Sequence, residues 1–140
     1  MGYEVRMRLI SRNTDYAVRA VCYIAGQKEK IVSAADLVKA INIPRPFLRK
    51  ILQALSKQGI LVSYKGKDGG FMLGRSADKI YLSELAQVFQ GVFSLNECTF
   101  KKALCPNRKR CFLKRKIDDI EGHVYSQLRA ITIESILKGK

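Results

Sequence analysis

Three of the four cysteines in this 140-residue chain lie within one short basic stretch, CTFKKALCPNRKRC. Six residues separate Cys98 from Cys105, and five separate Cys105 from Cys111. Iron–sulfur clusters and zinc are bound by thiolates, and the surrounding lysines and arginines favour the thiolate form. Such centres usually have four protein ligands, so three cysteines leave the set one short. The spacing leaves two interpretations open: a metal or cluster site completed from elsewhere, or three reduced thiols in a basic loop.

The chain carries a large positive charge, with a formal net charge of +14 and a sequence pI near 9.9. Residues 1–75 hold 14 Lys or Arg against 5 acids, and residues 98–140 hold 11 against 4. The segment 76–97 between them has 1 against 3. Two basic regions in one small protein indicate a polyanionic partner, with nucleic acid favoured over an anionic membrane surface.

No stretch of the sequence is typical of a membrane span or a secretion signal. There is no run of 18 apolar residues, and the start, MGYEVRMRLISRN, lacks the apolar centre of a signal peptide. We therefore expect a cytoplasmic protein without a membrane partner. Disulfides are rare in the cytosol, so clustered cysteines there favour metal or redox chemistry.

The first half of the chain has the pattern of a helix-turn-helix. Apolar residues recur at helical spacing in 13–25, 33–40 and 44–58. Ser33 and Asp36 have the spacing of a capping box at the start of the second helix. The third helix carries basic residues on its outer face, and we predict that the residues nearest the DNA bases are Arg45, Pro46, Arg49 and Lys50. The alternative is an ordinary solvated helix face.

A β-hairpin is predicted directly after this helix. Residues 60–64 and 71–73 are strand-like, and a glycine-rich turn joins them. Lys65 and Lys67 lie at the tip and Arg75 follows the second strand, where we expect all three to contact phosphates. Residues 80–81 are expected to add a short strand to the hairpin, and Ser83 to cap a helix over 84–90.

The last third of the chain predicts a long amphipathic helix over 112–130 and a short helix over 133–137. Apolar residues follow one seam along the long helix: Leu113, Ile117, Ile120, Val124 and Leu128. We interpret this seam as a dimerisation surface, with packing on its own domain as the alternative. The predicted fold class is mainly α with a small β-hairpin wing: a winged helix-turn-helix domain over 7–91, a cysteine loop over 92–111, and the dimerisation helix and a short helix over 112–140.

Taken together, these stretches resemble the IscR- and NsrR-type bacterial winged-helix regulators. The resemblance covers nearly the whole chain from Met7. The stretches that carry it are the cysteine loop, MRLISRNTDYAVRA, IPRPFLRKILQALSKQGIL, YKGKDGGFMLGRS and ITIESIL. It implies a homodimeric transcriptional repressor or activator that binds a palindromic operator in double-stranded DNA. It also implies that Cys98, Cys105 and Cys111 hold an iron–sulfur cluster, [2Fe–2S] or [4Fe–4S], whose state controls DNA binding.

The fourth cluster ligand differs among such regulators. IscR-like members have a histidine three residues after the third cysteine, where this chain has Lys114. NsrR-like members instead use an acidic residue near the N-terminus of the other subunit, and Asp15 matches it here. Asp15 can also be read as an ordinary acid in the first turn of a helix. A carboxylate ligand is more exchangeable than thiolate, so it would leave one iron open to nitric oxide or oxygen.

Three other readings belong to different classes. An enzyme is not expected, because the chain has no C-x2-C pair, no histidine near the cysteines and no phosphate-binding glycine loop. A second alternative is a structural zinc site on a DNA-binding domain. Such a protein would be colourless, whereas an iron–sulfur protein is brown or red. A cluster-free thiol sensor would respond through oxidation of the cysteines and need no iron.

Overall fold

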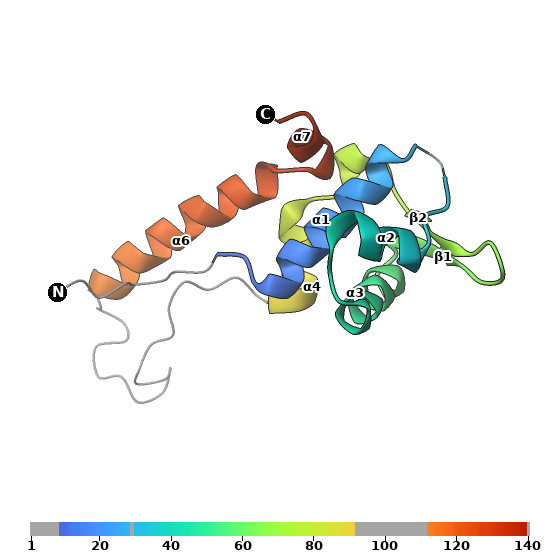
Figure 1. Ribbon diagram of the computed structural model, residues 1–140. Helices are drawn as coiled ribbons and strands as arrows, with labels where there is room; N and C mark the ends of the chain where they lie inside the picture. Colours follow the sequence, from blue (N-terminus) through green and yellow to red (C-terminus); the bar gives the residue numbers. More distant parts are fainter. Residues whose placement is uncertain (1–8, 29, 92–111, 140) are drawn as a thin grey trace.

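The computed structural model describes residues 9–28, 30–91 and 112–139. Within these ranges the chain is mainly helical, with one two-stranded antiparallel sheet (Figure 1). The helix-turn-helix unit, the hairpin and the shorter helices surround α1, while the long helix α6 extends away from them (Figure 1). This arrangement confirms the predicted fold class. None of the helices in the described ranges is long and apolar enough to cross a membrane.

The core is built around α1, Arg12–Gly26. Ala17, Ala20, Val21 and Ile24 recur at helical spacing, and each is at most 3% exposed. Helix α1 packs against four of the other helices and against the second strand of the sheet. Small side chains along α1 let several elements approach it closely, so one helix can organise the whole domain.

The helix-turn-helix consists of α2, Ala34–Ile41, and α3, Arg45–Lys57. The capping box is confirmed: the Ser33 hydroxyl accepts from the Asp36 N–H, and the Ser33 N–H donates to the Asp36 carboxylate. Asn42 ends α2 in the left-handed region at φ 53°, which turns the chain sharply before Pro44 starts α3. The buried side of α3 consists of Leu48, Ile51, Leu52 and Leu55.

The wing is formed by β1, Leu61–Tyr64, and β2, Gly70–Leu73, with Leu61 opposite Leu73 and Tyr64 opposite Gly70. Val32 adds an isolated bridge to Phe71 at the outer side of β2. A Cβ at Gly70 would lie 2.3 Å from the Val32 carbonyl oxygen, so only glycine permits this approach. The hairpin is therefore anchored both to the segment before α2 and, through β1, to α3.

Two predictions for the next segment are wrong. Residues 80–81 do not extend the hairpin; Tyr81 instead forms a bridge with Thr132, and the Leu82 N–H donates to the Ile131 carbonyl. Helix α4 spans Leu82–Gln90, so Ser83 lies inside it rather than capping it. The start of α4 is fixed by a long-range contact, the pairing of Tyr81 with Thr132. A short 3₁₀ helix, η1, Ala77–Lys79, precedes this pairing.

The C-terminal helices match their predicted bounds, with α6 at Phe112–Ala130 and α7 at Ile133–Leu137. Thr132 caps α7 through a reciprocal pair of hydrogen bonds with Ser135. Ile133 is fully buried and α7 packs against α1 and η1, which fastens this end of the chain to the domain. Helix α6 contacts the domain through α4.

Candidate nucleic-acid interface and sensing site

The exposed side of α3 carries the residues predicted to read DNA. Arg45, Pro46, Arg49 and Lys50 are all exposed, while Leu48 between them is fully buried. Burial of one face fixes the rotation of the helix, so these four side chains are held on the outer face of its first two turns. The first turn of α3 has no acidic residue, and its positive dipole end adds to the charge of the arginines.

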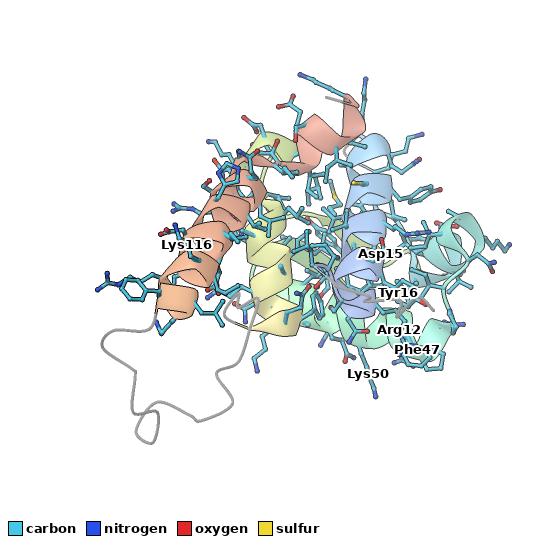
Figure 2. All side chains as sticks on the ribbon, turned by 90° about the vertical axis from the view of Figure 1, so that its left-hand side faces the viewer. Arg12, Asp15, Tyr16, Phe47, Lys50 and Lys116 are labelled. Atoms are coloured by element: carbon cyan, nitrogen blue, oxygen red, sulfur yellow. The ribbon has the colours of Figure 1, made fainter. Side chains whose placement is uncertain are left out.

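An aromatic residue that the sequence reasoning missed lies among these basic side chains. Phe47 is 43% exposed, and the Arg12 guanidinium carbon lies 5.2 Å from the centre of its ring. Figure 2 shows Arg12 on α1 beside Phe47, with Lys50 below them. This is within the range of a cation–π contact. A large aromatic at an exposed position near the start of a basic helix is the signal that could have drawn attention to Phe47.

The wing tip presents two of the predicted phosphate-contacting residues. Lys65 and Lys67 are exposed on either side of Gly66, whose φ of 109° is favourable for glycine. The wing and α3 are adjacent, since α3 packs directly against β1. A basic hairpin tip beside a basic helix face gives the surface charge for two sets of contacts to one duplex.

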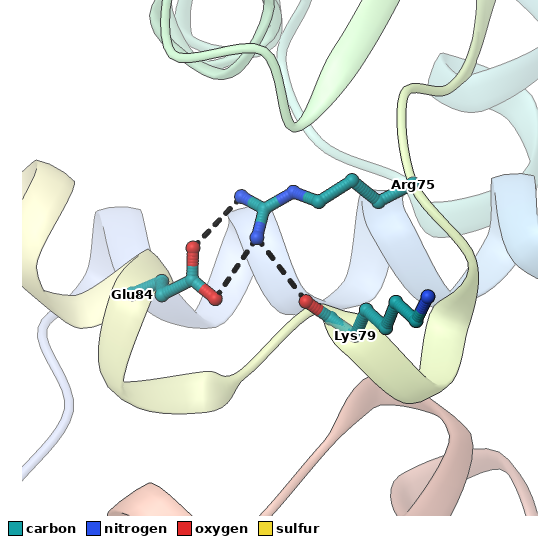
Figure 3. Close-up of polar contacts among 3 residues, drawn as sticks. All are labelled: Arg75, Lys79 and Glu84. Carbon is teal, nitrogen blue, oxygen red and sulfur yellow. Dashed lines mark hydrogen bonds and ion pairs between the residues drawn. The ribbon is translucent and has the colours of Figure 1, made fainter.

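Arg75, the third predicted phosphate contact, has a more defined environment. Its guanidinium donates to both Glu84 carboxylate oxygens, at 3.2 and 2.7 Å, and to the Lys79 carbonyl at 3.2 Å (Figure 3). The Arg75 and Glu84 side chains are 36% and 33% exposed. The bidentate pair ties the chain just after the wing to α4.

Asp15, the predicted fourth ligand, lies on the surface of the first turns of α1. Its carboxylate pairs with Arg19 at 3.2 Å, and its side chain is 47% exposed. It also lines an open groove of about 900 Å³ formed by residues of α1, α4 and α7, including Val18, Phe89 and Ile136. Cys98, Cys105 and Cys111 lie outside the described residues.

The fourth cysteine, Cys22, precedes the other three by at least 76 residues in the sequence. It lies on α1 and is partly buried against the core. Burial raises the pKa of its thiol above the ordinary value, because the thiolate loses solvation there. Cys22 is therefore held as a thiol at neutral pH and is poorly suited to metal binding or redox sensing.

Polar contacts join the end of α4 to the start of α1. The Ser11 N–H donates to the Gln90 side-chain oxygen at 2.8 Å, and the Gln90 side-chain nitrogen donates to the Leu9 carbonyl at 3.1 Å. Ser11 is also the N-cap of α1. These two bonds close a contact between segments far apart in the sequence, which sequence periodicity does not reveal.

The predicted dimerisation seam divides into two parts. Leu128 is 8% exposed within its own domain. Toward the other end, Leu113 and Ile120 are 68% and 53% exposed, while Ile117 and Val124 are partly buried. Phe112 beside the seam is 76% exposed. The C-terminal end of α6 thus packs on its own domain, and the N-terminal part of the helix carries a large exposed apolar surface.

The chain is similar in sequence to known transcriptional regulators. Residues 10–139 match the Rrf2 family, described as "Iron-dependent Transcriptional regulator". An HTH-type transcriptional regulator of Aquifex aeolicus is 28% identical, covering 92% of this chain and 91% of its own. The regulator IscR of Xenorhabdus nematophila is 29% identical over 96% of this chain and 81% of its own.

A solved structure has the same fold. CymR, the global cysteine regulator of B. subtilis, matches with a TM-score of 0.77 and 23% identity, covering 96% of this chain and 99% of its own.

Proposed function

Since the chain belongs to the Rrf2 family of transcriptional regulators, we propose that it is a homodimeric, sequence-specific DNA-binding regulator whose DNA affinity is controlled by an iron–sulfur cluster. The observation that carries the DNA-binding part is the exposed basic start of α3, fixed by the buried Leu48 and flanked by the basic wing tip. In this role, the outer face of α3 enters the major groove and Lys65, Lys67 and Arg75 face phosphates.

Dimerisation is supported by the exposed apolar part of α6. Leu113, Ile120 and Phe112 form an exposed apolar surface. Monomeric proteins rarely expose large apolar patches, which usually mark an interaction site. Pairing of α6 with a second copy would cover it, with Ile117, Val124 and Leu128 continuing the seam. A two-fold dimer would place its two α3 helices at half-sites about one helical turn apart, or a multiple of it, on a palindromic operator.

Cluster binding is supported by the donor set. Cys98, Cys105 and Cys111 of one subunit would supply thiolates, and Asp15 of the other a carboxylate, to a [2Fe–2S] or [4Fe–4S] cluster. Asp15 fits this role because its side chain is about half exposed on the wall of an open groove. When bound, the cluster would supply iron that responds to redox state, nitric oxide or iron supply. In the described structure, the ion-pair partner of Asp15 is Arg19.

A cluster-free thiol sensor is the second candidate. The basic setting of the three clustered cysteines supports it, because nearby lysines and arginines favour the reactive thiolate form. A structural zinc bound by the same thiolates is the third. All three share the DNA-binding surface and differ only in what the cysteine segment binds.

The test is an absorption spectrum, with iron and acid-labile sulfide assays, on protein purified without oxygen. We expect visible bands with matching iron and sulfide. Asp15→Asn removes the charged carboxylate at nearly constant size, and we expect it to lose iron faster in air than the wild type. Asp118→Asn is the matched control, because Asp118 is also an exposed helix acid in an i,i+4 ion pair. A colourless, iron-free protein that resists cluster reconstitution would contradict the cluster and favour the thiol or zinc alternative.

A further inference from the structure

The Gln90 side chain forms a two-point clamp on the segment that precedes α1. Its amide accepts from the Ser11 N–H at 2.8 Å and donates to the Leu9 carbonyl at 3.1 Å, so both ends of one planar group hold one stretch of backbone. Gln90 is the last residue of α4, and Gly91 ends the helix at φ 75°. The clamp therefore sits where α4 leads into residues 92–111, the segment with the three clustered cysteines.

From the clamp, the contacts continue into the first turn of α1. The Ser11 hydroxyl accepts from the Thr14 N–H at 3.2 Å and lies 3.0 Å from the Thr14 hydroxyl. Thr14 is fully buried, so the position of Ser11 is tied to the core. A shift of Ser11 would therefore move the start of α1 as a unit.

The residue after Ser11 reaches the recognition helix. The Arg12 guanidinium lies over the Phe47 ring at 5.2 Å (Figure 2). Phe47 lies between Pro46 and the buried Leu48, two residues before Arg49. The contact therefore falls in the first turn of α3, where a small change in orientation would move the side chains predicted to reach DNA bases.

We propose that Gln90, Ser11, Arg12 and Phe47 form a relay that couples the C-terminal end of α4 to the DNA-reading turn of α3. The relay rests on the proposed function, because it gives the cysteine segment a route to the DNA surface. Its members are positioning residues. The Gln90 bonds and the Arg12 contact are solvent-exposed and individually weak, so a modest displacement at the end of α4 can break them. Two arrangements separated by a small free-energy difference are what a ligand can switch between.

The first experiment replaces Gln90 in the full-length protein without cluster loading and follows Arg12 by NMR. Protons held over the face of an aromatic ring are shifted upfield by its ring current, so the Arg12 side-chain protons report directly on the Phe47 contact. We expect Gln90→Ala to move these protons toward their free-chain values and to shift the Phe47 and Leu48 amide signals. Gln90→Glu is the second variant, because it keeps an acceptor for Ser11 but places an oxygen against the Leu9 carbonyl.

The matched control is Gln87→Ala, the same change one turn earlier on α4, at another exposed position. It should leave the Arg12, Phe47 and Leu48 signals as in the wild type. If both Gln90 variants also leave these signals unchanged, the relay is wrong. A variant that fails to fold is recognised by loss of signals throughout the spectrum, in which case the other Gln90 variant decides.

The second experiment measures affinity for a duplex enriched from random-sequence DNA by the wild-type protein. In the wild type we expect cluster-loaded and cluster-free forms to differ at least fivefold, a usual size for coupling between sites. Gln90→Ala and Arg12→Lys should both reduce this ratio to below about twofold, while Gln87→Ala keeps it. Arg12→Lys retains the charge but loses the flat guanidinium face, so an unchanged ratio would show that the Phe47 contact carries no coupling.

The two proposals fail in different ways. A wild-type protein that takes up no cluster, or binds DNA equally in both forms, contradicts cluster control. The NMR experiment needs neither cluster nor DNA and still decides whether Gln90 reaches Phe47. Conversely, a wild type with a fivefold ratio that Gln90→Ala leaves intact supports the proposed function and overturns the relay.

Discussion

The Arg75 guanidinium and the Glu84 carboxylate form a bidentate ion pair, with an Nη2 to Oε2 distance of 2.7 Å. The pair joins the chain just after the wing to α4, and Arg75 adds a third bond to the Lys79 carbonyl. Arg75 was predicted from the sequence as a phosphate contact. Its geometry suggests a positioning role as well, because the donors that would face DNA already hold the base of the wing.

We predict that Glu84→Gln destabilises the fold by about 1 kcal/mol, because a bidentate, partly buried pair is replaced by a weaker neutral acceptor. Thermal or urea unfolding measures the change. Glu134→Gln is the control, since its exposed i,i+4 pair with Lys138 should be worth only about 0.3 kcal/mol.

DNA affinity of the same variant separates two roles for Arg75. Glu84→Gln removes a negative charge, so charge alone would strengthen binding to DNA. If Glu84 and Arg75 position the wing, binding should instead weaken despite the gain in net charge. Tighter binding by Glu84→Gln would favour a direct phosphate contact by a freed Arg75.

Local sequence signals predicted most of the helices well. The capping box at Ser33, the apolar stripe of α1 and the bounds of α6 each depend on neighbours within a few residues, and the structure has them as expected. The start of α4 was mispredicted because it is fixed by pairing of Tyr81 with Thr132, about 50 residues away. The Gln90 clamp and the Arg12 contact are equally long-range, and no periodicity in a single sequence encodes them.

Arg49 and Lys67 should make different contributions to DNA binding. Arg49 lies on the outer face of α3, and Lys67 lies at the wing tip. We expect Arg49→Ala to lose about 1–3 kcal/mol of discrimination between the preferred site and a mutated one. Lys67→Ala should weaken both sites alike and reduce the slope of log affinity against log salt by about 1.

Binding titrations at several salt concentrations, on matched and mutated duplexes, measure both effects. Lys57→Ala is the control, because Lys57 is exposed on the same helix but at its C-terminal end. Equal losses for Arg49→Ala on both duplexes would assign Arg49 to the phosphates. An unchanged salt slope for Lys67→Ala would show that Lys67 at the wing tip does not contact DNA phosphates.

Oligomeric state tests the seam on α6. Ile120 is 53% exposed in the single chain, so Ile120→Lys should leave the fold of one subunit intact while placing a charge in the proposed dimer interface. We expect sedimentation equilibrium to change from about twice the 15.8 kDa chain mass to the chain mass itself, together with a loss of at least tenfold in operator affinity.

The matched control for this variant is Ser126→Lys. Ser126 is also exposed on α6 and lies six residues on, which is roughly 240° around the helix from Ile120. The same added charge there should leave the dimer intact, because it faces away from the seam. If Ile120→Lys is still a dimer, the dimer interface does not include the N-terminal part of α6. The exposed Leu113 and Phe112 would then contact another partner.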